Sequence, residues 1–474
     1  MRKTLSKLLV PLAILAANAA SLLIQVFIPQ FLGPDEYSHF TVLWSYGQLF
    51  VVIFFEWMRS SVLRFSEGAD IELASRRRRF LMGAYLTTAA FLLGIALLAY
   101  ALGEIWPIAV WISIALVYSV CQGLFDATQV LSRARFENRK FALSWMSRSV
   151  LGLLGAIGFA YLSGSGSYAV IGMALSFSIT VLVFNFQYIW RLRFDGLHDH
   201  ESRRFLFGYG AFLAITSSVT ALFPALTRTA ALSGLGAEEA GGLLFALDLT
   251  QRTISALGMA VNLVVLQRSI RAAEFESSES KQNKLREQMA LVAGLILPAG
   301  LGFYLIQDSI SLLVVPDAYR VTYLESILGA CFCAALVSFR SYGIDTLFVV
   351  AGKSRNSIIG PSVSLISTLS TIFLWGEIFS YTAKHIVISM MLGLSLGTLA
   401  TVISARRQVT VVWPLKEFLI VLLACLAMYL GVGLVAIDPG LKKIIVDIII
   451  GGTAYTTVLI ALNFVDIRKR VFRF

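Results

Sequence analysis

The sequence predicts an all-α, polytopic membrane protein with about 14 transmembrane helices. Hydrophobic residues make up 57% of the 474-residue chain and charged residues only 14%, against about 25% charged residues in an ordinary soluble domain. The mean hydropathy is +0.78. A soluble protein of this size could not bury so much apolar surface. The composition therefore excludes a soluble enzyme, a nucleic-acid-binding protein and a secreted disulfide scaffold.

Apolar runs of about 20 residues favour membrane-spanning helices over the ten-residue alternation of a barrel. The expected spans are 8–31, 38–62, 80–102, 107–129, 143–162, 168–190, 205–227, 240–266, 287–307, 321–349, 357–376, 384–404, 417–436 and 444–464. The first run also resembles a signal peptide with a cleavage site at AANAA. Because the apolar run continues to Leu32, we expect a retained first helix.

The basic residues orient this layout. With the N-terminus in the cytoplasm, 30 of the 39 lysines and arginines fall in inner segments, five in outer loops and four inside helices. Basic residues collect in cytoplasmic loops, so we expect both termini on the cytoplasmic side of a bacterial cytoplasmic (inner) membrane. This placement explains the net charge of +11 without a nucleic-acid partner. The outer loops are short, which argues against a membrane glycosyltransferase or polymerase, and the chain is not expected to be an enzyme.

No cofactor is expected, apart from a proton or sodium ion that would couple transport to a gradient. The four cysteines lie in apolar stretches without a CxxC pair, so neither a metal site nor a disulfide framework is predicted. His198 and His200 share a charged loop that could bind a metal, but a solvated loop is the simpler interpretation. The chain has no Walker A pattern, so direct use of ATP is not predicted.

An internal repeat divides the chain. LGPDEYSHF precedes the second span and LGAEEAGGL precedes the eighth, at an offset of 203 that also aligns Gln48 with Gln251. Six spans separate the two copies, so both copies enter the membrane from the same side, as in a parallel repeat. The expected parts are a first six-helix bundle, a second bundle, and two further helices with a basic cytoplasmic tail. Their ranges are 1–203, 204–405 and 406–474.

Several segments resemble the polysaccharide transporter branch of the multidrug/oligosaccharidyl-lipid/polysaccharide (MOP) superfamily, the flippases of lipid-linked oligosaccharides. They are FLGPDEYSHF (31–40) with its continuation to RSSVLRF (59–65), LSRARFENRKFALSWMSRSVLGLL (131–154), LSGLGAEEAGGL (232–243), LLVVPDAYR (312–320) and AGKSRN (351–356). The resemblance covers nearly the whole chain. It implies two six-helix bundles in a V around a central cavity, with two additional C-terminal helices.

The resemblance also implies a function. Such a flippase would translocate polyprenyl-diphosphate-linked oligosaccharide repeat units for exopolysaccharide, capsule or O-antigen (lipopolysaccharide) assembly by alternating access. The expected partners are the lipid-linked oligosaccharide, membrane lipids, a polysaccharide polymerase and a chain-length regulator. The alternative is a cation-coupled small-molecule or drug antiporter of the same superfamily. The antiporters considered carry an acid in the first span, whereas this first span offers only Asn18 and Gln25.

Charged residues inside the membrane are the candidate site, because each costs about 2.5–3.5 kcal/mol on insertion scales. The candidates are the pairs Glu56–Arg59, Asp248–Arg252 and Arg340–Asp345. The spacing places the first two pairs each on one helix face, and the repeat makes their spans equivalent. One interpretation is structural ion pairing. The other is a cationic cavity, in which the resemblance implies that Arg59, Arg252 and Arg340 bind the lipid diphosphate through their planar forks.

Further polar residues complete the predicted site. Gln48, Gln251, Asn18 and Gln25 could hydrogen-bond sugar hydroxyls, although polar contacts between helices are an equally good interpretation. Glu56, Asp248 and Asp345 could bind the coupling proton or sodium ion, or serve only as ion-pair partners. Asp126 and Arg148 lie nearer the cytoplasmic ends of their spans, where interfacial side chains are expected.

Overall fold

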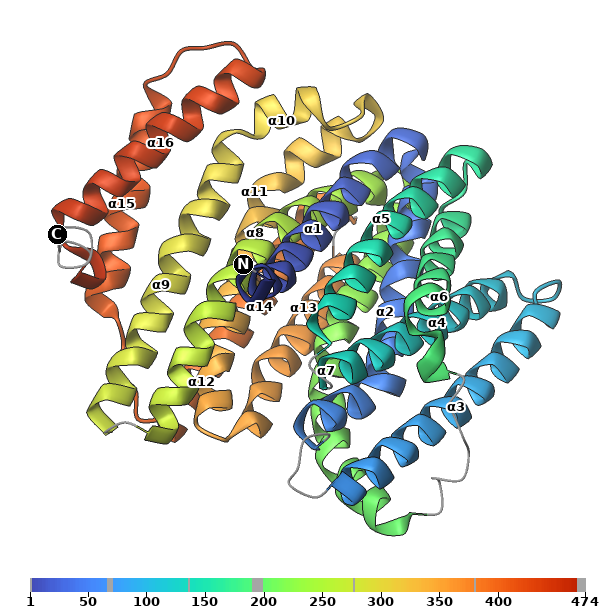
Figure 1. The fold of residues 1–474 in the computed structure, drawn as a ribbon. Helices are drawn as coiled ribbons and strands as arrows, with labels where there is room; N and C mark the ends of the chain where they lie inside the picture. The colour runs from blue at the N-terminus through green and yellow to red at the C-terminus, as the bar shows by residue number, and fades with distance from the viewer. Residues whose placement is uncertain are drawn as a thin grey trace. The chain divides into compact units, whose positions relative to one another are not determined.

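A computed structural model of the protein describes residues 2–65, 71–134, 137–189, 199–275, 278–378 and 381–466 (Figure 1). All regular structure in these ranges is helical. The first eight helices are α1 (Arg2–Phe31), α2 (Pro34–Phe65), α3 (Ile71–Ala101), α4 (Pro107–Ala134), α5 (Asn138–Ser163), α6 (Gly166–Ile189), α7 (His200–Leu235) and α8 (Ala237–Phe275). They are followed by α9 (Ser278–Leu305), α10 (Gln307–Leu313), α11 (Asp317–Phe339), η2 (Arg340–Ile344), α12 (Asp345–Val350), η3 (Ser354–Ile358), α13 (Ile359–Ile378), α14 (Ala383–Gln408), α15 (Leu415–Gly433), α16 (Leu441–Ala461) and η4 (Phe464–Asp466).

The all-α polytopic fold is confirmed, and every expected span overlaps helical structure; the span 321–349 covers α11, η2 and α12. Twelve helices of the described ranges are long and apolar enough to cross a membrane. The other two expected spans lie on α1, whose described apolar segment Ala16–Phe31 is shorter, and on α8, which carries Asp248 and Arg252. The short helix α10 and the π-helical turn η2 were not predicted, because one or two turns leave no long apolar run in a sequence.

The chain forms two compact units, Met1–Leu232 and Ser233–Phe474. The same helix pairs pack within each unit. In the first unit α2 packs against α4, and α5 against α6. In the second unit the equivalent partners are α8 with α11 and α13 with α14. The repeat expected from the sequence is therefore visible as a repeated packing pattern.

Small residues allow the tightest of these pairs to form. A Cβ atom on Gly155 of α5 would lie 2.6 Å from the carbonyl oxygen of Gly172 on α6. A Cβ atom on Gly397 of α14 would lie 2.5 Å from the carbonyl oxygen of Gly360 on α13. Membrane helices have little hydrophobic drive to associate with each other in lipid, so such close backbone contact supplies much of their attraction.

Helix α7 lies mostly in the first unit. Its contacts with α2 extend from Ser61, whose hydroxyl donates to the Leu206 carbonyl at 3.0 Å, to Arg228, which donates to the Thr41 carbonyl at 3.1 Å. The sequence repeat places the start of the second copy at residue 204, whereas the compact units divide after Leu232. The division into 1–203, 204–405 and 406–474 stays a prediction from the sequence repeat. The contacts between α7 and α2 explain why the first compact unit extends beyond residue 204.

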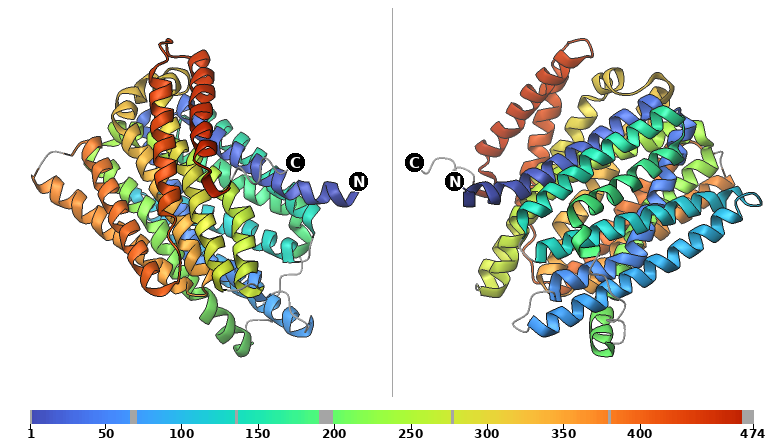
Figure 2. Two further views of the ribbon diagram at one scale, coloured as in Figure 1. Left: turned by 90° about the vertical axis from the view of Figure 1, so that its left-hand side faces the viewer. Right: turned by 45° about the vertical axis from the view of Figure 1, so that its right-hand side comes forward.

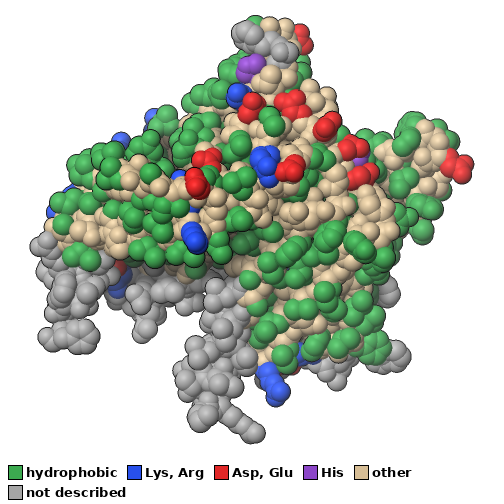
Figure 3. Space-filling model, turned by 90° about the horizontal axis from the view of Figure 1, so that it is seen from above, with side chains coloured by type: hydrophobic (Ala, Val, Ile, Leu, Met, Phe, Trp, Pro, Cys, Tyr) green, Lys and Arg blue, Asp and Glu red, His purple; other side chains and the backbone are tan. Residues whose placement is uncertain are grey.

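The last two helices belong to the second unit. Figure 2 shows α15 and α16 side by side, and α15 also packs against α9. Tyr455 of α16 donates a hydrogen bond to the Gly294 carbonyl of α9 at 2.6 Å. The face seen from above carries acidic side chains distributed among hydrophobic ones (Figure 3). Three helices that begin in segments the sequence places outside have acidic first turns. Their acidic residues include Asp35, Glu239 and Asp317.

Candidate functional site

The polar residues between α2 and α4 form the first part of the site. The side-chain amides of Gln48 and Gln122 bond each other reciprocally, at 2.8 and 3.2 Å. Gln48 also donates to the hydroxyl of Tyr118 at 2.7 Å, and the Trp44 indole donates to the same hydroxyl at 2.9 Å. Gly47 makes this possible, since a Cβ atom there would lie 2.6 Å from the Tyr118 ring. Gln48 therefore lies in a hydrogen-bonded seam between two membrane helices.

The predicted Glu56–Arg59 pair lies farther along α2. The guanidinium of Arg59 bonds both carboxylate oxygens of Glu56, at 2.8 and 2.9 Å. Glu56 is 13% exposed and also accepts a hydrogen bond from the Ser60 hydroxyl at 3.1 Å. The Arg59 side chain, in contrast, is 48% exposed. The Nε and Nη2 edge of this guanidinium is thus held by Glu56, while about half of the side-chain surface is exposed.

A pocket joins this ion pair to α4. Glu56 and Arg59 line it together with Asp126, Tyr85 and Phe55. The space open to water measures about 20 Å³, which suffices for roughly one water molecule. The pocket lies entirely within the first unit. A volume of this size could hold one water molecule beside the two carboxylates, Glu56 and Asp126.

Asp126 connects the pocket to the seam. It lies one helical turn beyond Gln122, from which its carboxylate accepts a hydrogen bond, and it interacts electrostatically with Arg59 and Arg148. The guanidinium of Arg148 lies 4.6 Å above the centre of the Phe177 ring, in a cation–π contact. Tyr118, Gln122 and Asp126 thus form a polar stripe at four-residue spacing on α4.

The sequence interpretation of this region was incomplete. Asp126 and Arg148 were expected at the membrane interface, and Tyr118 and Gln122 were not predicted as site residues. The four-residue spacing of Tyr118, Gln122 and Asp126 within an apolar span was the available signal. The spacing alone could not indicate which neighbouring helix this stripe faces.

The equivalent helices of the second unit carry a shorter polar chain. Gln251 of α8 donates to the Ser255 hydroxyl at 2.5 Å, and that hydroxyl lies 3.0 Å from the Ser338 hydroxyl on α11. Gln251 therefore contacts the α8–α11 interface, much as Gln48 contacts the α2–α4 interface. The repeat-equivalent glutamines both mediate packing between helices, and both are half-buried.

Asp248 and Arg252 share one face of α8, as expected from their spacing. Asp248 is 3% exposed and Arg252 is half-buried. Arg252 lies 15 residues after the first residue of α8, whereas Arg59 lies 25 residues after the first residue of α2. At 1.5 Å per residue this difference corresponds to about 15 Å along a helix. The two acid–arginine pairs lie on equivalent helices but at different depths, so the repeat does not superimpose them.

Arg340 and Asp345 are enclosed in the second unit. Arg340 is 3% exposed, and its Nε atom lies 3.7 Å from Asp345 Oδ2. It also donates to the Ser364 hydroxyl of α13 at 2.9 Å. Arg340 is the first residue of the π-helical turn η2 and Asp345 directly follows its last; such turns are found mostly as short insertions at functional sites. The enclosure of Arg340 favours a structural role over direct contact with a large substrate.

The two candidate polar residues of α1, Gln25 and Asn18, differ in burial. Gln25 is fully buried, and its side-chain oxygen accepts a hydrogen bond from the Tyr37 hydroxyl at 2.9 Å. This placement corresponds to the packing alternative, because a buried amide that contacts α2 is not open to sugar hydroxyls. Asn18 is half-buried, so the structure leaves both interpretations of this residue open.

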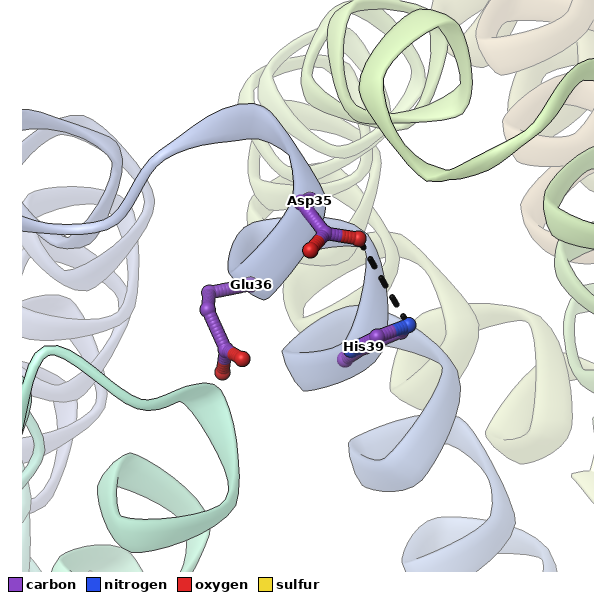
Figure 4. A group of neighbouring side chains, drawn as sticks. All are labelled: Asp35, Glu36 and His39. Atoms are coloured by element: carbon purple, nitrogen blue, oxygen red, sulfur yellow. Dashed lines mark ion pairs between the residues drawn. The ribbon is translucent and has the colours of Figure 1, made fainter.

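Asp35, Glu36 and His39 bring three ligand-type atoms within 4.8 Å of one another at the start of α2. His39 faces Asp35 at 3.7 Å, while Glu36 turns toward the first residue of α6 (Figure 4). Glu36 there accepts a hydrogen bond from the backbone N–H of Gly166 at 2.8 Å. Each carboxylate thus already has a partner within the protein, which weakens the case for a metal ion at this cluster.

Several solved structures share this fold, and they are transporters of the MOP superfamily. Lipid II flippase MurJ in an inward closed conformation aligns with a TM-score of 0.75 at 13% sequence identity, over 97% of this chain and 99% of that one. An inward-facing MATE family multidrug resistance transporter aligns with a TM-score of 0.62 at 12% identity, over 82% of this chain and 94% of that one. A MOP superfamily transporter from Pyrococcus furiosus aligns with a TM-score of 0.56 at 12% identity, over 83% and 95%.

No family model matches the sequence, and no curated protein matches it. At identities of 12–13% the structural similarity shows the fold alone. The chain is therefore a multi-pass membrane protein with the fold of the MOP superfamily transporters.

Proposed function

We propose that the protein is a flippase that moves polyprenyl-diphosphate-linked oligosaccharides from the inner to the outer leaflet of the bacterial cytoplasmic membrane. The products would serve exopolysaccharide, capsule or O-antigen assembly. Three observations support this proposal: the MOP superfamily fold, the sequence resemblance to polysaccharide flippases, and the accessible arginine of the first unit. A structure with that fold bears the name of a lipid II flippase, so the fold can serve a lipid-linked substrate.

The single observation that carries the proposal is the geometry of Arg59. Its side chain is 48% exposed although it lies on a candidate membrane span, and Glu56 holds its guanidinium through two bonds. Glu56 fixes the orientation of the Arg59 guanidinium by binding its Nε and Nη2 atoms. The N–H groups of Nη1 would then be available to an anion. A diphosphate would bind these groups with charge-assisted hydrogen bonds, which are about twice as strong as neutral ones. Arg252, half-buried on the equivalent helix, is the proposed second cation.

The order of events follows from the orientation predicted by the basic residues. Arg59 lies six residues before the end of α2 at Phe65, the end expected at the cytoplasm. It would therefore meet the substrate at the leaflet where lipid-linked oligosaccharides are assembled. The Gln48–Gln122 seam continues from this point toward the outer end of α2 and offers amide groups to hydroxyls. The polyprenyl tail would remain in lipid while the two units alternate access.

Coupling to an ion gradient is a further part of the proposal. Glu56 and Asp126 line one pocket with Arg59, so arrival of an anionic head group would change the charge balance of both acids. A proton or sodium ion taken up there would carry its charge across the membrane potential. One elementary charge crossing 100 mV supplies about 2.3 kcal/mol. Asp248 and Asp345 are the candidate acids of the second unit.

The drug-antiporter alternative predicts a different behaviour. MATE multidrug transporters share the fold, so the fold does not separate the two functions. The first helix of this chain, Arg2–Phe31, contains no carboxylate, which removes the acid expected in span 1 of such antiporters. The flippase is therefore the better-supported proposal, and growth in the presence of cationic drugs is the assay that separates the two.

Disruption of the gene tests the proposal. Lipid-linked repeat units should accumulate in the inner leaflet and surface polysaccharide should disappear, without a change in drug tolerance. Arg59→Ala should fail to restore the polymer. Loss of two charge-assisted bonds between Arg59 and the diphosphate would weaken substrate binding roughly ten- to a hundredfold. Arg59→Lys should restore it only in part, since an ammonium lacks the planar fork.

Arg320→Ala is the matched control. Arg320 forms a similar pair with an acid three residues earlier, Asp317, at 2.7 Å, but it lies in the first turn of α11 rather than in the candidate site. It should restore polysaccharide fully. Full restoration by Arg59→Ala, with membrane levels equal to those of the control, would contradict the assignment of Arg59. Normal polysaccharide in the disrupted strain would contradict the flippase itself.

A further inference from the structure

The Arg340–Asp345 ion pair depends on the π-helical turn that joins α11 to α12. Arg340 begins η2 and Asp345 begins α12, and the backbone N–H of Asp345 donates to the Arg340 carbonyl, five residues earlier. In an α-helix, residues five apart lie about 140° apart around the axis and face different sides. A π turn instead stacks residues that are five apart. The two side chains therefore meet, at 3.7 Å, because this turn is π-helical.

The other polar contacts of the turn suit both helical forms. The Thr346 hydroxyl donates to the Tyr342 carbonyl at 3.1 Å and accepts a hydrogen bond from the Gln288 amide of α9 at 3.0 Å. A threonine hydroxyl bonds the carbonyl four residues earlier in an ordinary α-helix as well. These bonds would thus persist if the turn became α-helical. The ion pair is the contact that requires the π form.

The two ends of the ion pair are held differently. Arg340 is 3% exposed and donates to the Ser364 hydroxyl of α13 at 2.9 Å. Its stem crosses Gly360 of α13, where a Cβ atom would lie 3.2 Å from Arg340 Cδ. The Asp345 side chain is 18% exposed, and its Oδ1 atom accepts no hydrogen bond from the described residues. Asp345 is therefore the partner that can change its state.

The surroundings of Asp345 favour a proton over a metal ion. Arg340 is the charged group that acts on Asp345 within the described part of the chain. Lys353, in the segment after α12, donates to the Gln408 carbonyl at 2.7 Å. A metal cation takes several oxygen ligands, whereas this site offers one carboxylate beside a guanidinium. The residues that α8, α9 and α14 present to η2 and α12 are uncharged, and they include Gly258, Gln288, Met289 and Ala405.

A proton on Asp345 would remove the contact that requires the π turn. Conversion of a five-residue turn to an α-helical one shifts the following residues by roughly one position, which is about 100° of rotation and 1.5 Å along the axis. Because α11 packs along α8 and α12 has only six residues, α12 is the part that would turn. We propose that protonation of Asp345 converts η2 from the π to the α form and rotates α12.

This rotation would exchange two sides of α12. Phe348 is fully buried in a cluster with Leu285 of α9 and Ala405 of α14, whereas Val349 is 48% exposed. A shift of one position places Phe348 on the exposed side and loosens the contact of these three helices at the end expected in the cytoplasm. The part that this switch plays in transport rests on the ion coupling proposed above. The switch itself can be tested without transport.

Thiol labelling of the full-length chain in nanodiscs tests the switch. The four native cysteines are first replaced by alanine. Val349→Cys should then react with a maleimide, and Phe348→Cys should stay protected. Asp345→Asn mimics the protonated acid and should raise the labelling rate of Phe348→Cys to that of Val349→Cys. Asp345→Glu retains the charge and should leave Phe348→Cys protected.

A relocated acid separates the effect of spacing from that of charge. Ile344→Asp/Asp345→Ile keeps both charges but spaces them four residues apart, which an α-helix brings to one face. It should expose Phe348→Cys, and it decides the question if Asp345→Asn fails to fold. Asp317→Asn is the control, because it neutralises an acid that pairs with Arg320 in the first turn of α11. It should leave Phe348→Cys protected.

The pH dependence of the chain with native Asp345 completes the test. The ratio of Phe348→Cys to Val349→Cys labelling should rise as the pH falls, and the ratio cancels the pH dependence of the reagent. Exchange of potassium for sodium should not alter it, and an increase in sodium would overturn the proton assignment. Protection of Phe348→Cys at every pH and in both neutralised and relocated variants would overturn the switch. Exposure in Asp345→Asn with normal polysaccharide export would support the switch and contradict its role in coupling.

Discussion

The carboxylate of Glu36 accepts a hydrogen bond from the backbone N–H of Gly166 at 2.8 Å, so α2 caps the first residue of α6. The second unit repeats this contact: Glu239 of α8 accepts a hydrogen bond from the backbone N–H of Ala383, the first residue of α14, at 3.2 Å. The first N–H groups of a helix lack partners within the helix, and its N-terminus favours negative charge. The two equivalent acids therefore satisfy the same need in each copy.

This duplicated cap predicts matched effects on stability. Glu36→Ala and Glu239→Ala should each lower the free energy of unfolding by about 0.5–2 kcal/mol, the usual cost of losing a helix cap. Because the residues lie in different units, the effects in the double variant should add. Thermal unfolding in detergent measures this. Glu377→Ala, outside both caps, is the control, and an effect as large there would contradict the assignment of the caps.

The close contact between α5 and α6 predicts opposite effects for two glycines of one helix. Gly155→Ala should destabilise the protein by about 1–3 kcal/mol, because the new methyl group would meet the backbone of Gly172. Gly158, three residues later, borders open space, since a Cβ atom there would meet no atom within 4 Å. Gly158→Ala should therefore be neutral or stabilise the helix by up to about 1 kcal/mol. Equal unfolding temperatures for the two variants would contradict the packing.

The enclosed pair Arg340–Asp345 predicts strong non-additivity. Arg340→Met alone leaves the Asp345 carboxylate in the interior without its cation, at a cost of about 3–5 kcal/mol. Arg340→Met/Asp345→Leu removes both charges and should be much less destabilised than Arg340→Met. The amount of folded protein recovered from membranes and its unfolding temperature measure the difference. A double variant no better than the single one would indicate that the charges do not act as a pair.

The reciprocal amide pair predicts a measurable coupling. Gln48→Ala and Gln122→Ala should show an interaction energy of about 0.5–3 kcal/mol in a double-mutant cycle, because each removes the partner of the other. Gln122→Ala should have the larger individual effect, because it loses a bond to the Asp126 carboxylate, whereas Gln48→Ala loses a neutral bond to the Tyr118 hydroxyl. Unfolding in detergent measures the stabilities, and polysaccharide export measures activity. Additive effects would show that the seam contributes no joint contact.

The helices could be predicted to a large extent from the sequence. An apolar run of about 20 residues must be helical in a bilayer, because lipid offers no partner to backbone N–H and C=O groups. The π-helical turn at Arg340 was not predictable in the same way, since it depends on how α11, α12 and α13 fit around a buried guanidinium. For Gln25 the sequence left both chamber lining and packing between helices open, because it could not indicate that Tyr37 would be the partner of Gln25 across the α1–α2 turn.

The amino-acid sequence by itself determined that this chain crosses a membrane many times as helices, and that it carries two related copies with charged residues in equivalent spans. Only the tertiary structure decided which of those polar residues meet. Gln48 finds Gln122 from 74 residues away, and Asp126 joins Arg59 in one pocket. The physical reason is that lipid dictates backbone hydrogen bonding locally, whereas the rotation of each helix about its axis is set by side-chain packing against distant helices.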